Sequence, residues 1–411
     1  MEKEKSGITK IAYLIHTFPL YSLTFVVDEI VALRRMGSSI DLYGVRKPPP
    51  DEYPDCYGKY ASETTYALPV SIPLHLFRHI GLLLSHPIRY TSCLLYILKV
   101  GGVNLRQRIK LFYYFSEAVE LNKNISSKSY DHLHVHFLFG GAIIAIFLNK
   151  LSGIRYSLTA HGTDFLVERF FISEKIKHAE FVRVGTKYNA EFISQDISPD
   201  DRSKLFVLPF GIDAKKVSQD KVTREIDQRK NQPVKMINIG RLVWQKGQKD
   251  LIEAVRLLKD KGIPLSLEIV GEGELRPELE SLISRYGLQE TIVLRGALPR
   301  EEALEIMRSA DIFAFSSVSE GFGIVLLEAM LCGLAVVAPN INGVPEIIID
   351  GRTGSIYQSG SAEDLADKLE VMIMNEDKRK HYAKSALDDV LARFDQDEKV
   401  SLFLSKVKSV L

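Results

Sequence analysis

The chain has 411 residues, of which 46% are hydrophobic and 26% are charged, and its formal net charge is +1. This length exceeds what one hydrophobic core normally serves, so it predicts two domains. The near-neutral charge argues against nucleic acid as the main partner, because nucleic-acid-binding domains usually carry a strong basic excess.

The cysteines and the apolar runs give an expectation for the compartment. Cys56, Cys93 and Cys332 share no CxxC spacing and are odd in number, which indicates reduced thiols in a cytoplasmic protein. The charged start MEKEKSGITK leads into a strand-like run and is not typical of a secretory signal. The sequence contains no run of about 18 apolar residues that would span a bilayer.

The first half of the chain alternates between two kinds of segment. Residues 10–17 predict a strand, residues 24–37 predict a helix that ends at Gly37, and residues 39–46 predict a second strand. Further strand-like runs are DHLHVHF, YSLTAHG and EFVRVGT, with a helical run GAIIAIFLNKLSG after the first of them. Alternating strands and helices predict a parallel sheet covered on both faces.

Residues 73–100 are rich in Leu, Ile and Tyr, but polar residues and a proline interrupt the run: Arg78, His79, His86, Pro87 and Arg89. Two interpretations are open. The segment is a pair of amphipathic helices packed on a domain, or it is an interfacial basic and aromatic surface that contacts a membrane or a lipid-linked substrate.

Around residues 209–234 the composition becomes polar and poor in large apolar residues, as in a linker. The alternation then restarts, with strand-like runs VKMINIG, LSLEIVGEG, TIVLRGAL, DIFAFSS and AVVAPN separated by helical runs. We therefore predict an N-terminal domain at 1–210, a linker at 211–234 and a C-terminal domain at 235–391. Both are doubly wound α/β units, and ligands are expected in a cleft beyond the carboxyl ends of the strands.

The stretch SSVSEGFGIVLLEAM places two carboxylates, Glu320 and Glu328, eight residues apart. Glu320 follows a strand, at the edge of the sheet where ligands bind. Gly321 and Gly323 permit close approach of the backbone, and the helix that starts near Gly323 directs its amides and positive dipole end to the same place. The alternative is a solvated turn residue and a charge on a helix surface.

Two further glycine-rich strand ends belong to the same half. NIGRLVWQKGQKDL ends a strand at Gly240 and places Arg241 and Lys246 before a helix, where cations and amides can hold a diphosphate. VGEGEL, with Gly271, is a second glycine-rich strand end, and NINGVPEIIIDGRTG adds two tight turns. Taken singly, these could be a solvated basic loop and surface turns.

The order of these motifs resembles the nucleotide-sugar domain of the family 4 (group 1) glycosyltransferases, which have the GT-B fold: two Rossmann-like doubly wound domains that face each other across a cleft. The resemblance is close over residues 235–360 and looser over the N-terminal half. It implies that Arg241 and Lys246 bind the donor diphosphate and stabilise its departing charge, and that Glu328 holds the ribose hydroxyls. It implies further that Glu320 contacts the transferred sugar near the reacting carbon, and thus has a catalytic role with the two cations. Further donor contacts are implied for Gly240, Gly271, Gly321, Phe322, Gly323 and Ile324.

The same resemblance implies a mechanism and an acceptor side. The family retains the anomeric configuration, with the leaving phosphate taking the proton of the acceptor, and it needs no divalent metal. No cofactor and no metal are therefore expected. TAHGTDF places His161 toward the donor sugar, with a catalytic role, and makes Asp164 a candidate contact. His16 and Thr186 are further acceptor-side candidates, with Thr186 as a possible helix cap.

Two more features follow from the family pattern. HLHVHF places His132, His134 and His136 on one face of a strand, which suggests a metal. However, the run matches a common strand of the family, which favours a structural or cleft-lining role. The amphipathic helix at about 392–411 is expected to pack back on the N-terminal domain.

The opening HTFPLYSLTFVVDEIVALRRMG resembles transferases for exopolysaccharide and other cell-surface glycans. Leu23 departs from that pattern, where an acid is usual, and Phe210 departs where PNGVD is typical. The expected donor is a UDP-sugar in preference to GDP-mannose, and the expected acceptor is a glycan, lipid-linked, at the inner face of the cytoplasmic membrane. Alternatives are a transferase that makes a small soluble glycoside, a UDP-sugar epimerase and a non-catalytic sugar-nucleotide binding subunit.

Overall fold

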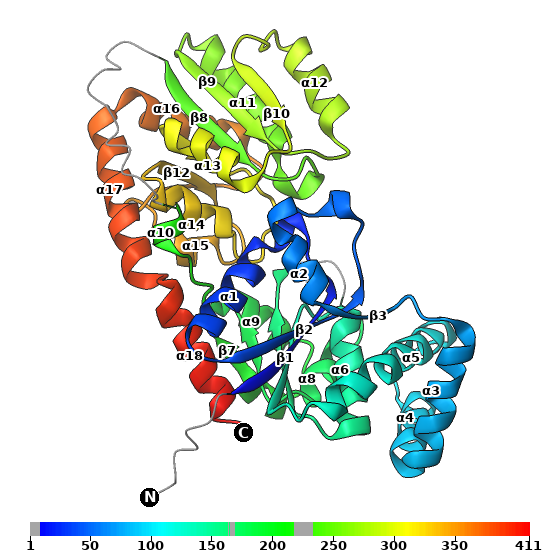
Figure 1. Cartoon of the computed structure of the whole chain (residues 1–411). Helices are drawn as coiled ribbons and strands as arrows, with labels where there is room; N and C mark the ends of the chain where they lie inside the picture. The colour runs from blue at the N-terminus through cyan, green and yellow to red at the C-terminus, as the bar shows by residue number, and fades with distance from the viewer. Residues whose placement is uncertain (1–8, 163, 165–168, 218–232) are drawn as a thin grey trace, which may run out of the picture. The chain divides into compact units, whose positions relative to one another are not determined.

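The computed structural model describes residues 9–162, 164, 169–217 and 233–411. The contacts divide the chain into two compact units (Figure 1). The first unit comprises Met1–Gly185, Asn189–Pro209 and Lys399–Leu411, and the second comprises Thr186–Tyr188 and Phe210–Glu398. Most of the predicted linker at 211–234 lies outside the described residues, and the rest of it belongs by its contacts to the second unit.

A parallel sheet forms the centre of the first unit, and its seven described strands lie in the order β3-β2-β1-β4-β5-β6-β7. The chain order reverses between β1 and β4, which makes the carboxyl ends of these two strands the switch point of the sheet. The strands are β1 (Lys10–Thr17), β2 (Ser39–Arg46), β3 (Thr65–Leu68), β4 (His132–His136), β5 (Tyr156–Ala160), β6 (Val182–Val184) and β7 (Leu205–Val207).

Helices cover both faces of this sheet. One apolar core joins the sheet to α4 (Pro87–Lys99), α5 (Leu105–Ser127), α6 (Gly140–Ser152), α8 (Ile172–Lys177) and α9 (Lys187–Ser194). A second core, on the other face, joins it to α1 (Thr24–Arg35), α2 (Gly58–Glu63) and α18 (Gln396–Lys408). α3 (Ile72–Ser85) packs against α4 and α5 rather than against the sheet (Figure 1).

Local sequence explains where these helices begin and end. α1 buries the stripe Val26, Ile30 and Leu33, which has the spacing of one helix face. It ends before Gly37, whose positive φ of 85° suits the turn into β2. α5 begins with a capping box, in which the side chain of Asn104 accepts from the amide of Gln107 and the side chain of Gln107 accepts from the amide of Asn104.

The second unit repeats the same plan with six described parallel strands in the order β10-β9-β8-β11-β12-β13. Its switch point lies between β8 and β11. The strands are β8 (Val234–Ile239), β9 (Leu265–Val270), β10 (Ile292–Gly296), β11 (Ile312–Ala314), β12 (Ala335–Pro339) and β13 (Ser355–Tyr357).

Helices again lie on both faces of the second sheet. One core includes α10 (Ala214–Val217), α13 (Arg300–Ser309), α14 (Ile324–Leu331), α15 (Val344–Ile347) and α17 (Glu376–Arg393). The other core includes α11 (Gln248–Asp260), α12 (Arg276–Arg285) and α16 (Ala362–Met374). Among the described residues, every helix is too short or too polar to cross a membrane.

Candidate functional site

The switch point of the second sheet brings together two predicted site residues. Lys246 ends a short turn after β8, and Glu320 lies in the loop after β11. The Nζ atom of Lys246 is 2.5 Å from Oε2 of Glu320, and both side chains are about four-fifths buried. Ser316 Oγ donates to the carbonyl oxygen of Lys246 at 2.8 Å, and Asn342 Nδ2 donates to that of Glu320 at 2.8 Å. The backbone of each residue of the ion pair is therefore held in place by a side-chain hydrogen bond.

Glycines allow the loops at this edge to pack backbone against backbone. A Cβ atom on Gly271 would lie 2.0 Å from the carbonyl oxygen of Gly240, and one on Gly273 would lie 2.3 Å from that of Leu242. Since such distances are impossible for real side chains, only glycine fits at these strand ends. The predicted glycines thus hold the loops after β8 and β9 together.

Arg241 stands in the same loop as Lys246 and is exposed. Its guanidinium has no hydrogen bond or ion pair among the described residues, whereas Gln248 Nε2 donates to its carbonyl oxygen at 3.1 Å. Trp244, between the two cations, is 61% exposed. An exposed cation next to a mostly buried lysine is an arrangement that suits a phosphate.

Glu328 lies on α14 and pairs with a residue that the sequence analysis missed. Arg300, at the start of α13, donates from Nε to Oε1 of Glu328 at 2.9 Å, and its NH2 group lies 2.8 Å from the same oxygen. The carboxylate is therefore fixed at the carboxyl side of the sheet. An arginine 28 residues away in sequence gives no local signal of this contact.

The segment from Gly321 to Ile324 forms the entry to α14. Gly323 is the residue before the helix, with a φ of 83°, and the helix itself has eight residues from Ile324. The amides of its first turn have no intrahelical acceptor. Phe322 is buried against Phe210 at a ring distance of 5.2 Å and against Phe394 at 6.1 Å. Phe322 therefore anchors the turn in the core, and only its amide remains for a ligand.

In the first unit, a chain of hydrogen bonds leads to His161. Nδ1 of His136 lies 3.3 Å from Nε2 of His161, and Nε2 of His136 lies 3.2 Å from Oε1 of Glu29. Arg183 donates to the other carboxylate oxygen at 2.5 Å, and the Tyr13 hydroxyl donates to Oε1 at 2.9 Å. Glu29, Arg183 and Tyr13 were missed in the sequence, although Glu29 lies on the buried stripe of α1.

Burial and the neighbouring charges shift the pKa values of Glu29 and His161. Burial by itself raises the pKa of Glu29, but the charge of Arg183 and the hydrogen bond from His136 hold that pKa well below its usual range. The ionised carboxylate accepts only, so Nε2 of His136 donates to it. Burial, and then His136, lower the pKa of His161 well below its usual range. The low pKa keeps the imidazole of His161 neutral.

The other acceptor-side candidates lie at different depths. Asp164 is fully buried, and its Oδ2 accepts from the amides of Leu138 and His161, each at 2.8 Å. It therefore holds the backbone of His161. Thr186 is buried directly before α9. His16 is half-buried in β1, and burial, followed by the charge of Arg46, lowers its pKa.

The three histidines of β4 are buried and face one side of the strand, as the alternation predicts. His132 and His134 hydrogen-bond Ser157, and His134 also hydrogen-bonds Thr159. Ligand atoms of Glu29, His134 and His136 lie within 4.8 Å of one another, a spacing that a metal ion could use. The guanidinium of Arg183 on Glu29 already supplies positive charge there, which explains the cluster as a structural network.

The two departures from the family pattern have structural roles. Leu23 is 5% exposed and belongs to the core that α1 forms with the sheet. Phe210 is buried in the core of the second unit, where it packs on Phe322. Both positions are apolar contacts within their own unit.

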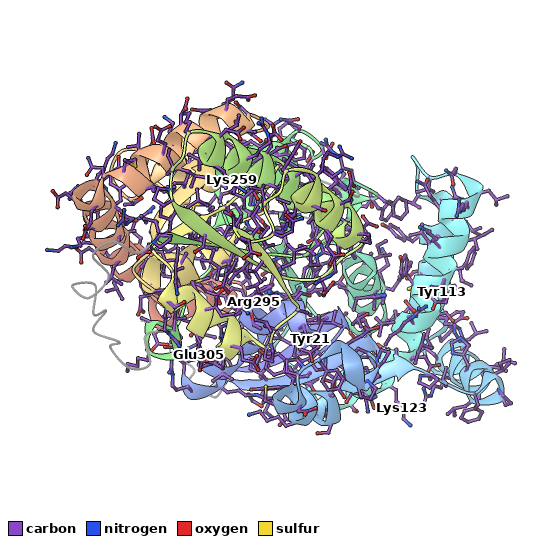
Figure 2. The ribbon with its side chains drawn as sticks, turned by 90° about the horizontal axis from the view of Figure 1, so that it is seen from above. Tyr21, Tyr113, Lys123, Lys259, Arg295 and Glu305 are labelled. Carbon is purple, nitrogen blue, oxygen red and sulfur yellow. The ribbon has the colours of Figure 1, made fainter. Side chains whose placement is uncertain are left out.

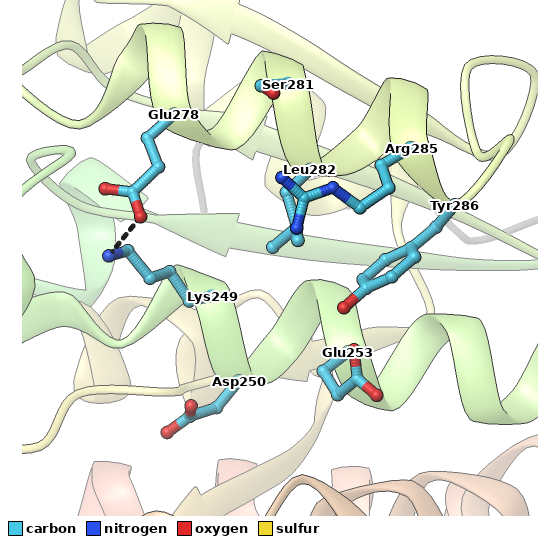
Figure 3. Close-up of a pocket in the computed structure, with 8 residues that line it drawn as sticks. All are labelled: Lys249, Asp250, Glu253, Glu278, Ser281, Leu282, Arg285 and Tyr286. Atoms are coloured by element: carbon cyan, nitrogen blue, oxygen red, sulfur yellow. Dashed lines mark ion pairs between the residues drawn. The ribbon is translucent and has the colours of Figure 1, made fainter.

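A hollow lies between α11 and α12 (Figure 3). Lys249 and Glu278 face each other across it, with 2.6 Å between Nζ and Oε1. None of the predicted site residues lines it. The candidate site is therefore the edge of the second sheet and not this hollow.

Two doubly wound sheets, with two cations and a carboxylate at the switch point of the second, define a doubly wound α/β protein of two units. The chain belongs to the group 1 glycosyltransferases. Residues 219–389 match the family model for glycosyl transferases group 1, and residues 95–195 match the model for glycosyl transferase 4-like proteins.

Individual relatives agree with this assignment. An uncharacterised glycosyltransferase of Methanocaldococcus jannaschii is 30% identical over 275 residues, which are 65% of this chain and 72% of that protein. The putative colanic acid biosynthesis glycosyltransferase WcaL of Salmonella typhimurium is 25% identical over 383 residues, 88% of this chain and 89% of its own. A Campylobacter jejuni enzyme, N,N'-diacetylbacillosaminyl-diphospho-undecaprenol alpha-1,3-N-acetylgalactosaminyltransferase, is 29% identical over 250 residues, 60% of this chain and 62% of its own.

Among solved structures, Anabaena Alr3699/HepE in complex with UDP matches with a TM-score of 0.71 and 17% identity, covering 98% of this chain and 100% of that one. This likeness establishes the GT-B fold.

Proposed function

We propose that this glycosyltransferase moves a hexose from a nucleoside-diphosphate sugar to a glycan acceptor and retains the anomeric configuration. The observation that carries the proposal is the ion pair of Lys246 and Glu320 at the switch point of the second sheet, beside exposed Arg241. Cations and a carboxylate within one loop cluster suit the two parts of such a donor, its diphosphate and its sugar hydroxyls.

Donor binding exchanges the partner of Lys246. In the ligand-free protein its charge is held by Glu320 at 2.5 Å. A diphosphate carries more negative charge than one carboxylate, so Lys246 moves to the phosphate together with Arg241. Glu320 is then released to accept hydrogen bonds from the hydroxyls of the transferred sugar, and Glu328, held by Arg300, takes those of the ribose.

The chemical step then needs no divalent metal. The bond between the anomeric carbon and the diphosphate oxygen breaks, and Lys246 and Arg241 stabilise the charge that develops on that oxygen. The acceptor oxygen bonds to the same face of the anomeric carbon, and its proton passes to the departing diphosphate oxygen. We assign a catalytic role to His161, and we assign His16, Asp164 and Thr186 to the acceptor side.

We propose UDP as the nucleotide and a lipid-linked polysaccharide precursor as the acceptor. HepE, which shares the fold, binds UDP and UDP-glucose. Relatives are named for colanic acid and amylovoran biosynthesis, and the Campylobacter relative for a diphospho-undecaprenol acceptor. The proposed place of action is the cytoplasmic face of the membrane, with peripheral attachment.

The donor is identified with the single tryptophan of the chain. Trp244 lies between Arg241 and Lys246, so its fluorescence reports binding at this loop. We expect a change with one of a panel of UDP-, GDP- and ADP-sugars, and nucleotide release only when lipid extract is added. The Arg241→Ala variant should weaken UDP binding roughly tenfold to a hundredfold.

The Glu320→Gln variant separates the pairing of Glu320 with Lys246 from its proposed contact with the transferred sugar. It should bind UDP alone as tightly as the wild type or up to about tenfold more tightly, because Lys246 is released, while transfer falls by at least about a hundredfold. Glu290→Gln, an exposed glutamate of the same unit, is the control. Unchanged turnover of Glu320→Gln, or a product anomer that differs from the donor by NMR, would overturn the proposal. Activity that survives EDTA tests the metal independence.

A further inference from the structure

Exposed apolar side chains are concentrated in one short part of the chain. Of the 23 large hydrophobic residues that are exposed in the described residues, 14 lie between Ile72 and Tyr113. They belong to α3, α4 and α5, which form a projection from the first unit (Figure 1). Figure 2 shows side chains along this projection and labels Tyr113 on α5. A concentration of this kind marks a surface that contacts something other than water.

α3 is turned with its polar side toward the protein. His75 Nδ1 lies 2.5 Å from Glu120 Oε1 on α5, Arg78 pairs with the same carboxylate, and His79 Nδ1 lies 2.9 Å from the Tyr90 hydroxyl. No residue of α3 is buried, whereas Phe77 is 71% and Leu84 is 76% exposed. A helix in water buries its apolar stripe. The opposite orientation indicates an apolar environment on the outer side.

Two of the three helices, α3 and α5, present apolar residues as a stripe. Ile72, Leu76 and Ile80 recur every four residues on α3, and Leu105 and Ile109 do so at the start of α5. Residues four apart lie on one face of a helix. α3 has 14 residues and α4 has 13, which is too short to span a bilayer but enough to lie in its surface.

The charge of this surface has one sign. No aspartate or glutamate occurs from residue 64 to residue 116, where the chain has six lysines and arginines. Arg89 and Arg108 donate to carbonyl oxygens of the protein. Lys99, Arg106 and Lys110 are exposed, and their side chains have no hydrogen bond or ion pair among the described residues. Their charge is complementary to an anionic lipid surface.

We propose that α3, α4 and the first half of α5 form a membrane-docking surface that binds anionic lipid bilayers. The apolar stripes enter the region between headgroups and acyl chains, and Lys99, Arg106 and Lys110 contact lipid phosphates. This surface deepens the proposed function, because it holds the first unit against the bilayer that carries a lipid-linked acceptor. Bilayer binding itself does not require the donor site.

Flotation with vesicles tests the proposal without any nucleotide sugar. The full chain should float with vesicles of phosphatidylcholine containing about 30% phosphatidylglycerol, and roughly tenfold less with phosphatidylcholine alone. The double variant Phe77→Glu with Leu84→Glu should lose binding at least about tenfold. Val371→Glu with Met374→Glu, which places the same charges on exposed apolar positions of α16, should float like the wild type.

The electrostatic part has its own pair of variants. Arg106→Gln with Lys110→Gln should reduce binding to anionic vesicles roughly tenfold, and about 0.5 M salt should remove most of that difference. Lys384→Gln with Lys408→Gln removes two exposed charges elsewhere and should change nothing. All four variants should keep the thermal unfolding and the Trp244 response to nucleotide of the wild type.

The proposal is overturned if the wild type stays unbound with anionic vesicles, or if Phe77→Glu with Leu84→Glu floats undiminished. A lipid-independent dimer that the same double variant dissociates would assign the surface to a second copy of the chain. Failure of the donor experiment with intact flotation would overturn the proposed function and leave the docking surface standing.

Discussion

The carboxylates of the candidate site share one property, which is a cationic partner. Glu320 pairs with Lys246, Glu328 with Arg300, and Glu29 with Arg183. Pairing keeps a buried carboxylate ionised, since an isolated buried charge would be neutralised by a proton. The charges of these residues are therefore set by the fold itself.

Glu117 on α5 behaves differently. It is 2% exposed, and neither of its oxygens makes a hydrogen bond among the described residues. Burial raises the pKa of Glu117 from 4.5 to about 7, opposed in part by nearby Tyr113 and by the charge of Arg46. Since this pKa is higher in the folded protein, the folded state binds more protons, and stability falls as the pH rises through this window.

Replacing Glu117 by glutamine removes this loss. We expect Glu117→Gln to gain stability relative to the wild type by roughly 3 kcal/mol between about pH 4.5 and about pH 8. Urea unfolding at several pH values measures the difference. Glu191→Gln, an exposed glutamate of the same unit, should show no such trend. A difference between Glu117→Gln and the wild type that stays constant with pH would mean that the carboxyl is ionised in the folded protein.

The sequence was informative for residues whose spacing is local. Glu320, Glu328, Arg241 and Lys246 stand within short motifs, whose order indicated the donor site. Pairing across long separations gave no such pattern: Arg183 meets Glu29 across 154 residues. Such contacts depend on strand order, which a single sequence leaves open.

At the scale of elements, the turn into α11 depends on one glycine. Gly247 has a φ of 61° and precedes α11, directly after Lys246. A Cβ atom there would lie 2.0 Å from the carbonyl oxygen of Ser316, in the loop after β11. The turn that carries Lys246 is thereby packed against the loop that leads to Glu320.

The two glycines that flank α11, Gly247 and Gly262, allow the cost of a left-handed backbone to be measured apart from the cost of a steric clash. Gly262, after the end of α11, has a φ of 73° and open space where a Cβ would be. We expect Gly262→Ala to cost about 1 kcal/mol for the left-handed backbone alone. Gly247→Ala should cost at least about 3 kcal/mol, because backbone must also move. Urea unfolding measures both.

Donor binding provides the second readout for these glycines. Gly247→Ala displaces Lys246 and should weaken UDP binding, whereas Gly262→Ala should leave it unchanged. Equal destabilisation by the two substitutions would contradict the close packing of the two loops.

Elements with ordinary amphipathic patterns were predictable, and α3 shows why others were not. The segment 73–100 was expected to contain two amphipathic helices, and α3 and α4 confirm the helices. Which side of α3 faces the protein was left open, because a periodic pattern marks two faces without saying which one is buried. The partner of its polar face, Glu120, lies 45 residues after His75.

At the scale of the whole molecule, the first unit is assembled from both ends of the chain. Lys399–Leu411 belongs to it, while the preceding segment Phe210–Glu398 belongs to the second unit. In this last segment, Val400, Phe403, Leu404 and Val407 of α18 enter the core beneath β1 and β2. The N-terminal sheet therefore completes its core only with the end of the chain.

Phe403 is the test of this arrangement. Its side chain is fully buried, with ring centroids 4.7 Å from His134 and 6.2 Å from Phe181. Phe403→Ala should lower the stability of the first unit by about 3–5 kcal/mol, whereas Leu402→Ala, at a position 44% exposed, should have little effect. Hydrogen exchange should show faster exchange in β4 and β5 and unchanged exchange in β12, although α17 directly precedes α18 in the chain. If Phe403→Ala instead loosens β12, the last helix supports the second unit and the first unit is complete without it.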